Sequence, residues 1–159
     1  MIVKARARSR ETYDDVPLSA LMRAAQSTYA SAVERAQAGV GCDDLPSSGG
    51  YLISAMNWSG ASLEAVLRWM GVSKQAVSQS VDLLVLRGYL RRAEDPQDRR
   101  KVNLVLTPRG RAAASAAKSA IKAVDVAARA RVGAGLFTNT RTTLIALMEM
   151  GRRPDQRRR

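Results

Sequence analysis

Four polar side chains near the start of one predicted helix are the residues best suited to chemistry in this chain. They share a helical face and are Lys74, Gln75, Ser78 and Gln79, while the other face carries Val77, Val81, Leu84 and Val85 at helical spacing. Long polar side chains at the beginning of a helix can read base edges in the DNA major groove, where glutamine suits adenine and lysine suits guanine. The pattern predicts a surface that reads nucleic acid; an ordinary exposed helix face is the alternative.

Turns on either side must position this helix. Gly71 precedes it, at a point where a residue without a Cβ can adopt the left-handed conformation of a sharp turn. Ser73 is the predicted N-cap, and its hydroxyl with the nearby backbone N–H groups is expected to hold a DNA phosphate. Gly88 ends the helix. From residue 67 onward the sequence therefore indicates a helix, a tight turn and a second helix.

A charged hairpin is predicted directly after this helix. Residues 89–92 form a short strand, and residues 101–106 pair back onto it with alternate side chains facing inward, namely Val102, Leu104 and Leu106. The polar tip between the strands supplies the candidate DNA contacts Arg99 and Arg100, and Lys101 at the start of the second strand is a third. Three further arginines are either phosphate contacts or solvated, namely Arg87, Arg91 and Arg92. Together these elements predict a winged helix-turn-helix.

The segment GVSKQAVSQSVDLLVLRGYLRRAEDPQDRRKVNLVLTPRGR, residues 71–111, resembles the DNA-binding lobe of the MarR family of bacterial transcription regulators. Its most specific part is DPQDRR, followed by a strand and the Leu-Thr-x-x-Gly pattern at 106–110. The resemblance implies that Asp98 braces the tip of the wing and that Arg100 enters the minor groove. Leu67 departs from helix-turn-helix patterns, which usually place a small residue there, and we expect it to be tolerated.

Composition favours a nucleic-acid partner. The chain has 159 residues and a net charge of +12, which attracts polyanions or an anionic membrane surface. The predicted wing and polar helix favour double-stranded DNA over the membrane. With no apolar run of about 20 residues, no signal-peptide pattern and a single cysteine, we expect a cytoplasmic, nucleoid-associated protein without a membrane partner.

Long helices flank the winged segment. Apolar periodicity predicts a first helix over 18–38, which glycines end. Thr107 and Pro108 begin a second, alanine-rich helix that runs to about residue 131. Gly133 to Gly135 break this helix, and a last helix is predicted over 138–150. The predicted fold is mainly α with a small β-hairpin wing (α+β). Its parts are a basic arm (1–16), a MarR-like domain (17–151) and a basic tail (152–159); within the domain, 17–45 and 108–151 are dimerisation helices and 46–107 the winged helix-turn-helix.

The terminal helices carry apolar stripes that a small winged lobe cannot cover. The last helix presents Leu144, Ile145, Leu147, Met148 and Met150. Burial against a second copy would be strongly favourable, and the resemblance implies a two-fold dimer formed by the first and last helices. Such a homodimer reads a pseudo-palindrome with half-sites about one DNA turn apart. A monomer whose helices cover its own core is the alternative.

The resemblance also implies a pocket for a small aromatic or phenolic effector. Candidate lining residues are Tyr29, Tyr51, Met56, Trp58, Trp69 and Met70, each of which could instead be ordinary core. Some MarR-like regulators sense peroxide through a cysteine. Here the carboxylates of Asp43 and Asp44 follow Cys42 and disfavour the thiolate that such chemistry needs.

Enzymatic motifs are missing from the sequence. The chain has no histidine, Gly-rich phosphate loop, nucleophile elbow or metal-ligand pair, so we expect no catalysis, no metal and no cofactor. The predicted function is a sequence-specific DNA-binding transcriptional regulator, a ligand-responsive repressor acting as a homodimer on a pseudo-palindromic operator. The alternative is an architectural, sequence-tolerant DNA-coating protein.

Overall fold

The computed structural model describes residues 13–46, 49–50, 52–54, 56, 74–94 and 102–150. Its elements, in chain order, are α1 (Leu18–Ala38), α4 (Lys74–Leu86), β1 (Leu90–Glu94), β2 (Val102–Leu106), α5 (Pro108–Val132) and α6 (Ala134–Met150). The described residues between 49 and 56 are also helical. The predicted mainly helical fold with one β-hairpin is confirmed.

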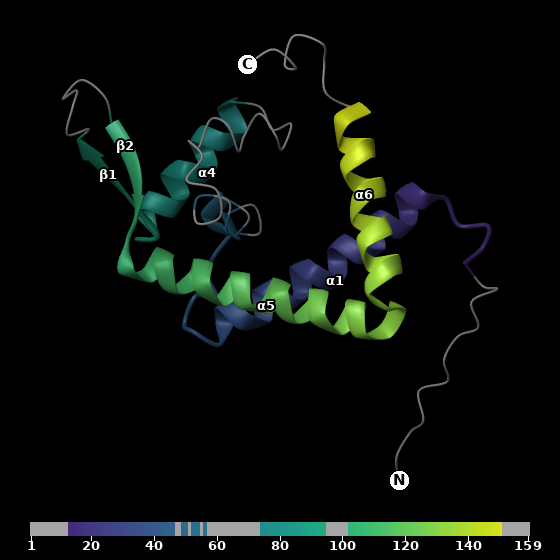
Figure 1. Ribbon diagram of the computed structural model, residues 1–159. Coiled ribbons are helices and arrows are strands. Elements are labelled where there is room, and N and C mark those ends of the chain that lie inside the picture. Colours follow the sequence, from purple (N-terminus) through teal and green to yellow (C-terminus); the bar gives the residue numbers. More distant parts are fainter. Residues whose placement is uncertain are drawn as a thin grey trace.

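α5 is the long central element of the fold (Figure 1). α1 packs along it, the β-hairpin and α4 lie at its first end, and α6 turns away from its far end. The side chains of Ala113, Ala114 and Ala117 are completely buried, because methyl groups let two helices approach closely. The alanine-rich helix α5 therefore packs closely against α1 of the same chain.

The predicted hairpin and the predicted start of α5 are present, but β1 ends two residues later than the predicted strand 89–92, because Ala93 and Glu94 pair with Asn103 and Val102. β1 and β2 are antiparallel, with Leu90 opposite Leu106 and Arg92 opposite Leu104. Thr107 is the N-cap of α5, and its Oγ accepts a hydrogen bond from the backbone N–H of Gly110 at 3.0 Å. This cap turns the chain directly from β2 into α5, so the hairpin is joined to the long helix without a loop.

A small core holds α4 against the hairpin. Leu84, Tyr89 and Leu90 are fully or almost fully buried, together with Ile53 from the helical segment before α4. The described part of the predicted apolar face of α4 is confirmed, since Val81 is buried and Val85 packs against this core. Gly88 has φ +72°, so the residue that ends this helix adopts the left-handed conformation.

The structure corrects the predicted break before the last helix. α6 begins at Ala134, four residues earlier than predicted, and Gly135 lies inside it. Gly133 alone makes the break, because its φ of +87° ends α5 while its carbonyl already accepts the N–H of Phe137 at 3.2 Å. A second glycine in a first helical turn weakens a helix without ending it.

Cys42 follows α1, in a segment that is neither helix nor strand. Its side chain is 2% exposed and belongs to the core cluster that contains Tyr89 and Ala113.

Among the described residues, no helix combines the length and the apolar character needed to cross a bilayer.

Candidate nucleic-acid interface

The first half of α4 carries the predicted reading surface. Gln75, Ser78 and Gln79 are exposed, on the face turned away from the buried Val81 and Leu84. The predicted separation of polar and apolar faces is therefore correct for these residues. Ser73 and the side chain of Lys74 lie outside the described residues, although the backbone of Lys74 begins the helix. That these side chains contact bases stays a prediction.

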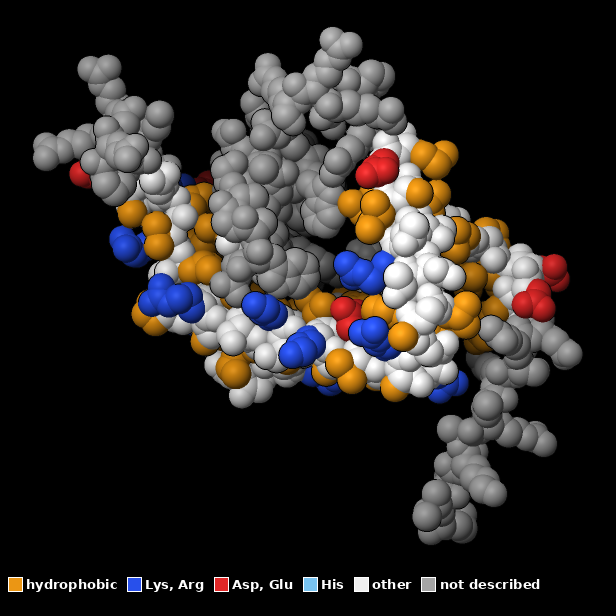
Figure 2. All heavy atoms as spheres, in the orientation of Figure 1, with side chains coloured by type: hydrophobic (Ala, Val, Ile, Leu, Met, Phe, Trp, Pro, Cys, Tyr) orange, Lys and Arg blue, Asp and Glu red, His pale blue; other side chains and the backbone are white. Residues whose placement is uncertain are grey.

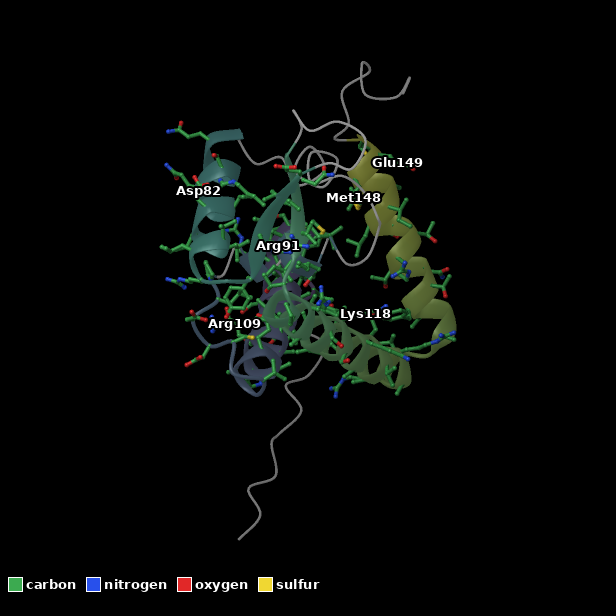
Figure 3. The ribbon with its side chains drawn as sticks, turned by 90° about the vertical axis from the view of Figure 1, so that its left-hand side faces the viewer. Asp82, Arg91, Arg109, Lys118, Met148 and Glu149 are labelled. Carbon is green, nitrogen blue, oxygen red and sulfur yellow. The ribbon has the colours of Figure 1, made fainter. Side chains whose placement is uncertain are left out.

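The hairpin stands directly after α4, as a wing would. Figure 3 views the molecule from the side of the hairpin and labels Asp82 on α4 and Arg91 on β1. The predicted tip residues Asp98, Arg99, Arg100 and Lys101 lie outside the described residues.

Arg91 and Arg92 differ in their surroundings. Both are exposed, but an Nη of Arg92 lies 2.5 Å from a carboxylate oxygen of Asp82 on α4. An ion pair between side chains this exposed adds little stability. It does hold the guanidinium of Arg92 over α4, so Arg91 is the better candidate for a phosphate contact on β1.

A polar cluster that no sequence pattern predicted lies at the far end of α4. It consists of Asp44, Tyr89 and Arg109, and we call it the Tyr89 cluster. The hydroxyl of the buried Tyr89 donates to the carboxylate of Asp44. Arg109 donates to the same carboxylate at 2.8 Å, and its guanidinium carbon lies 4.4 Å from the centroid of the Tyr89 ring. Asp44 is thus the ion-pair partner of Arg109 and the hydrogen-bond acceptor of Tyr89.

Ionisation equilibria reflect these contacts. The hydrogen bond from Tyr89, followed by the charge of Arg109, holds the pKa of Asp44 below its ordinary value. Burial, together with the hydrogen bond to Asp44, raises the pKa of Tyr89. The phenol therefore stays protonated and the carboxylate stays charged across the physiological range.

The candidate effector-binding residues are only partly described. Tyr51, Trp58, Trp69 and Met70 lie outside the described residues, and Met56 packs against the core cluster. The hydroxyl of Tyr29 on α1 donates to Asp125 on α5 at 2.6 Å.

A cavity of about 30 Å³ lies beside the last half of α1 and is lined by Ala30, Val33, Glu34, Gln37, Leu45, Pro46 and Gly50. It has room for about one water molecule, and none of its described lining residues is a predicted pocket residue.

The predicted apolar stripes on the terminal helices are exposed in the single chain. On α6 the predicted side chains are Leu144, Ile145, Leu147, Met148 and Met150, and Leu136, which the prediction did not include, is exposed as well. At the start of α1 the exposed side chains are Leu18, Leu21 and Met22. Figure 2 shows hydrophobic side chains gathered over α6. Ile145 is 48% exposed and Leu18 52%, so neither helix buries these side chains within its own chain.

An exposed polar helix followed by a β-hairpin and carried on long packed helices defines a winged-helix protein. Residues 55–101 match the sequence model of the MarR family. The chain therefore resembles MarR-family transcriptional regulators, in the sequence of its central segment and in its fold. No curated protein matches the chain.

Solved structures show the same fold over most of the chain. A probable transcriptional regulator from Pseudomonas aeruginosa is 23% identical, with a TM-score of 0.62 over 84% of this chain and 98% of that one. CouR from Rhodococcus jostii RHA1, bound to p-coumaroyl-CoA, is 24% identical, with a TM-score of 0.59 over 88% and 96%. A MarR family protein of Mycobacterium tuberculosis in complex with salicylic acid is 26% identical, with a TM-score of 0.55 over 84% and 98%. CouR is described as a transcriptional repressor in a further structure with a 23-mer DNA duplex.

Proposed function

We propose that this protein is a sequence-specific DNA-binding transcriptional regulator, and more narrowly a homodimeric, effector-responsive repressor that acts on DNA in the cytoplasm. The observation that carries the proposal is the exposed polar face of α4 directly before the hairpin. The net charge of +12 supplies the attraction to phosphates that such a surface needs. Repression by occupying a promoter requires no catalysis.

In this proposal α4 enters the major groove by its N-terminal half. Gln75, Ser78 and Gln79 read base edges together with Lys74, while Ser73 and the free N–H groups of the first turn hold a phosphate. The wing adds Arg99, Arg100 and Lys101, with Arg100 in the minor groove and Asp98 bracing the tip. The side chain of Arg91 on β1 contacts a phosphate of the DNA backbone.

Dimerisation is supported by the apolar surface of α6 and of the start of α1. We assign residues 17–45 and 108–151 to the dimerisation region and 46–107 to the winged lobe. Exposed side chains such as Leu18 and Ile145 would lose their contact with water in a two-fold interface. A two-fold arrangement places two copies of α4 on successive turns of DNA and so favours a pseudo-palindromic operator.

An aromatic or phenolic acid is the effector class that we propose. The support comes from the ligands of two structurally similar proteins, p-coumaroyl-CoA in CouR and salicylic acid in the mycobacterial protein. The effector would lie between the dimerisation helices and the winged lobe, among the candidate residues named above. A ligand that prefers one spacing of the two α4 helices weakens DNA binding and is itself bound less tightly in the DNA complex.

The basic face of α5 favours one alternative function. Arg111, Lys118, Lys122 and Arg129 fall along one side of this helix and are exposed (Figure 2). They extend positive charge beyond α4, as an architectural protein that coats DNA without regard to sequence would require.

Binding to the DNA upstream of the protein's own gene, against random DNA of equal length, distinguishes the two functions. A regulator should prefer one upstream site by about 10³-fold or more at physiological salt, and footprinting should show protection of two half-sites. Gln79→Ala should reduce that preference while leaving binding to random DNA unchanged; Asn139→Ala on α6 is the matched surface control. A preference near one for every upstream sequence would instead identify a coating protein.

A further inference from the structure

The guanidinium of Arg109 connects three segments that are distant in sequence. Arg109 lies in the first turn of α5 and donates to the carbonyl oxygen of Arg87, directly after α4, at 2.8 Å. Its second Nη donates to Asp44 at 2.8 Å and to the carbonyl oxygen of Gly41 at 3.3 Å, both in the loop that follows α1. One side chain thus joins the end of α4 to the end of α1 at the start of α5 (Figure 3).

Tight packing surrounds this junction. The Tyr89 ring beneath the guanidinium is fully buried, and the hydroxyl of Thr107 donates to the carbonyl oxygen of Gly88 at 2.6 Å. On the other side, the amide of Gln37 at the end of α1 donates to the carbonyl oxygen of Ala113 on α5 at 3.5 Å. Hydrogen bonds therefore hold the end of α1, the end of α4 and the start of α5 together.

The ion pair itself contributes little to stability. The side chains of Arg109 and Asp44 are 40% and 43% exposed, and pairs at that exposure are screened by water. A planar guanidinium with several donors is well suited to fixing the directions of several acceptors at once, which a lysine cannot do. The contacts of Arg109 therefore fix the relative orientation of the segments that they join more than they add to the free energy of unfolding.

We infer that Arg109, acting through the Tyr89 cluster, is a positioning residue that sets the angle of α4 relative to α1 and α5, and thereby the half-site spacing that the protein prefers. α4 has 13 residues and is about 20 Å long, and its DNA-reading residues lie at the end away from Arg109. A rotation of about 10° at the junction moves that end by about 3 Å, close to the rise of one DNA base pair. This inference rests on the proposed function, because it takes α4 to be the helix that reads DNA.

The test measures binding of the full-length protein to duplexes that carry its footprinted site with the half-sites moved apart or together by one base pair. The wild type should prefer its natural spacing by about tenfold or more. Arg109→Gln should reduce that preference to within about threefold, and Arg109→Lys, which keeps the charge but not the planar fork, should also reduce it. Arg131→Gln is the control, since Arg131 is an exposed arginine in the last turn of the same helix and lies outside the basic face named above.

Affinity for a duplex with one half-site, together with thermal unfolding, separates positioning from folding. Both quantities should be unchanged in Arg109→Lys, because α4 and its core remain intact. Retention of the wild-type spacing preference in Arg109→Gln and Arg109→Lys would overturn the inference while leaving the proposed function standing. A wild type that binds no site better than random DNA would overturn both.

Discussion

Gly110 packs its backbone against the carbonyl oxygen of Tyr89, so closely that a Cβ at this position would overlap that oxygen. The carbonyl cannot move easily, because it accepts the backbone N–H of Thr107 at 3.1 Å. Gly110→Ala should therefore lower the free energy of unfolding by about 1–3 kcal/mol, measured by urea denaturation. Gly135→Ala is the control: a Cβ there meets no atom within 4 Å, and the helix should become equally or more stable. Equal effects of the two substitutions would contradict this close approach.

Leu84 and Leu86 lie on the same helix and differ almost completely in burial. Leu84 is 0% exposed and belongs to the core, whereas Leu86 is 82% exposed. Leu84→Ala should reduce the free energy of unfolding by about 2–5 kcal/mol, because it leaves a cavity beneath α4. Leu86→Ala should change it by less than about 0.5 kcal/mol. A large loss from Leu86→Ala would show that a partner or another segment covers this side chain.

Tyr29 should make the protein sensitive to alkaline pH. Burial of its side chain, the hydrogen bond to Asp125 and the negative charge of Asp125 raise the pKa of Tyr29 to about 12. A tyrosine in the unfolded chain titrates near 10. The folded chain holds this proton more tightly, so the stabilisation is complete below about pH 10 and is lost as pH rises toward 12. Melting temperatures between about pH 8 and 11.5 should therefore fall less steeply for Tyr29→Phe than for the wild type. Part of the decline should remain, because the pKa of Tyr89 is also raised.

Asp125→Asn tests the contribution of Asp125 to the raised pKa of Tyr29 separately from that of burial. Removing the carboxylate should bring the pKa of Tyr29 down toward its ordinary value, measured by tyrosinate absorbance during an alkaline titration. An unchanged titration curve in Asp125→Asn would show that the hydrogen bond between α1 and α5 does not form in solution.

The apolar surface of α6 predicts that the protein is a dimer in solution. Ile145→Asp places a charge among side chains that the dimer would bury, and it should shift sedimentation toward the mass of one chain at micromolar concentration. Asn139→Asp adds the same charge at an exposed polar position of α6 and should leave the dimer intact. A wild type that sediments as a single chain would refute the dimer. An Ile145→Asp variant that is still a dimer would show that the dimer interface does not include this surface of α6.

Local patterns in the sequence determined the elements and their faces. Thr107 followed by Pro108 marks the start of α5, a left-handed glycine marks the end of α4, and alternation of apolar residues marks β2. The polar face of α4 also followed from helical spacing alone. These features depend on neighbours within a few residues, so a single sequence contains them.

Only the tertiary structure decided how those elements meet. Asp44, Tyr89 and Arg109 are widely separated in sequence, and no periodicity marks them as partners. The burial of Cys42 likewise depends on packing between distant segments, and the pairing of Arg92 with Asp82 depends on how the neighbouring elements α4 and β1 lie against each other. A short segment can specify where a helix begins and which side of it is apolar, but which charged groups face one another depends on how separate elements come together in space.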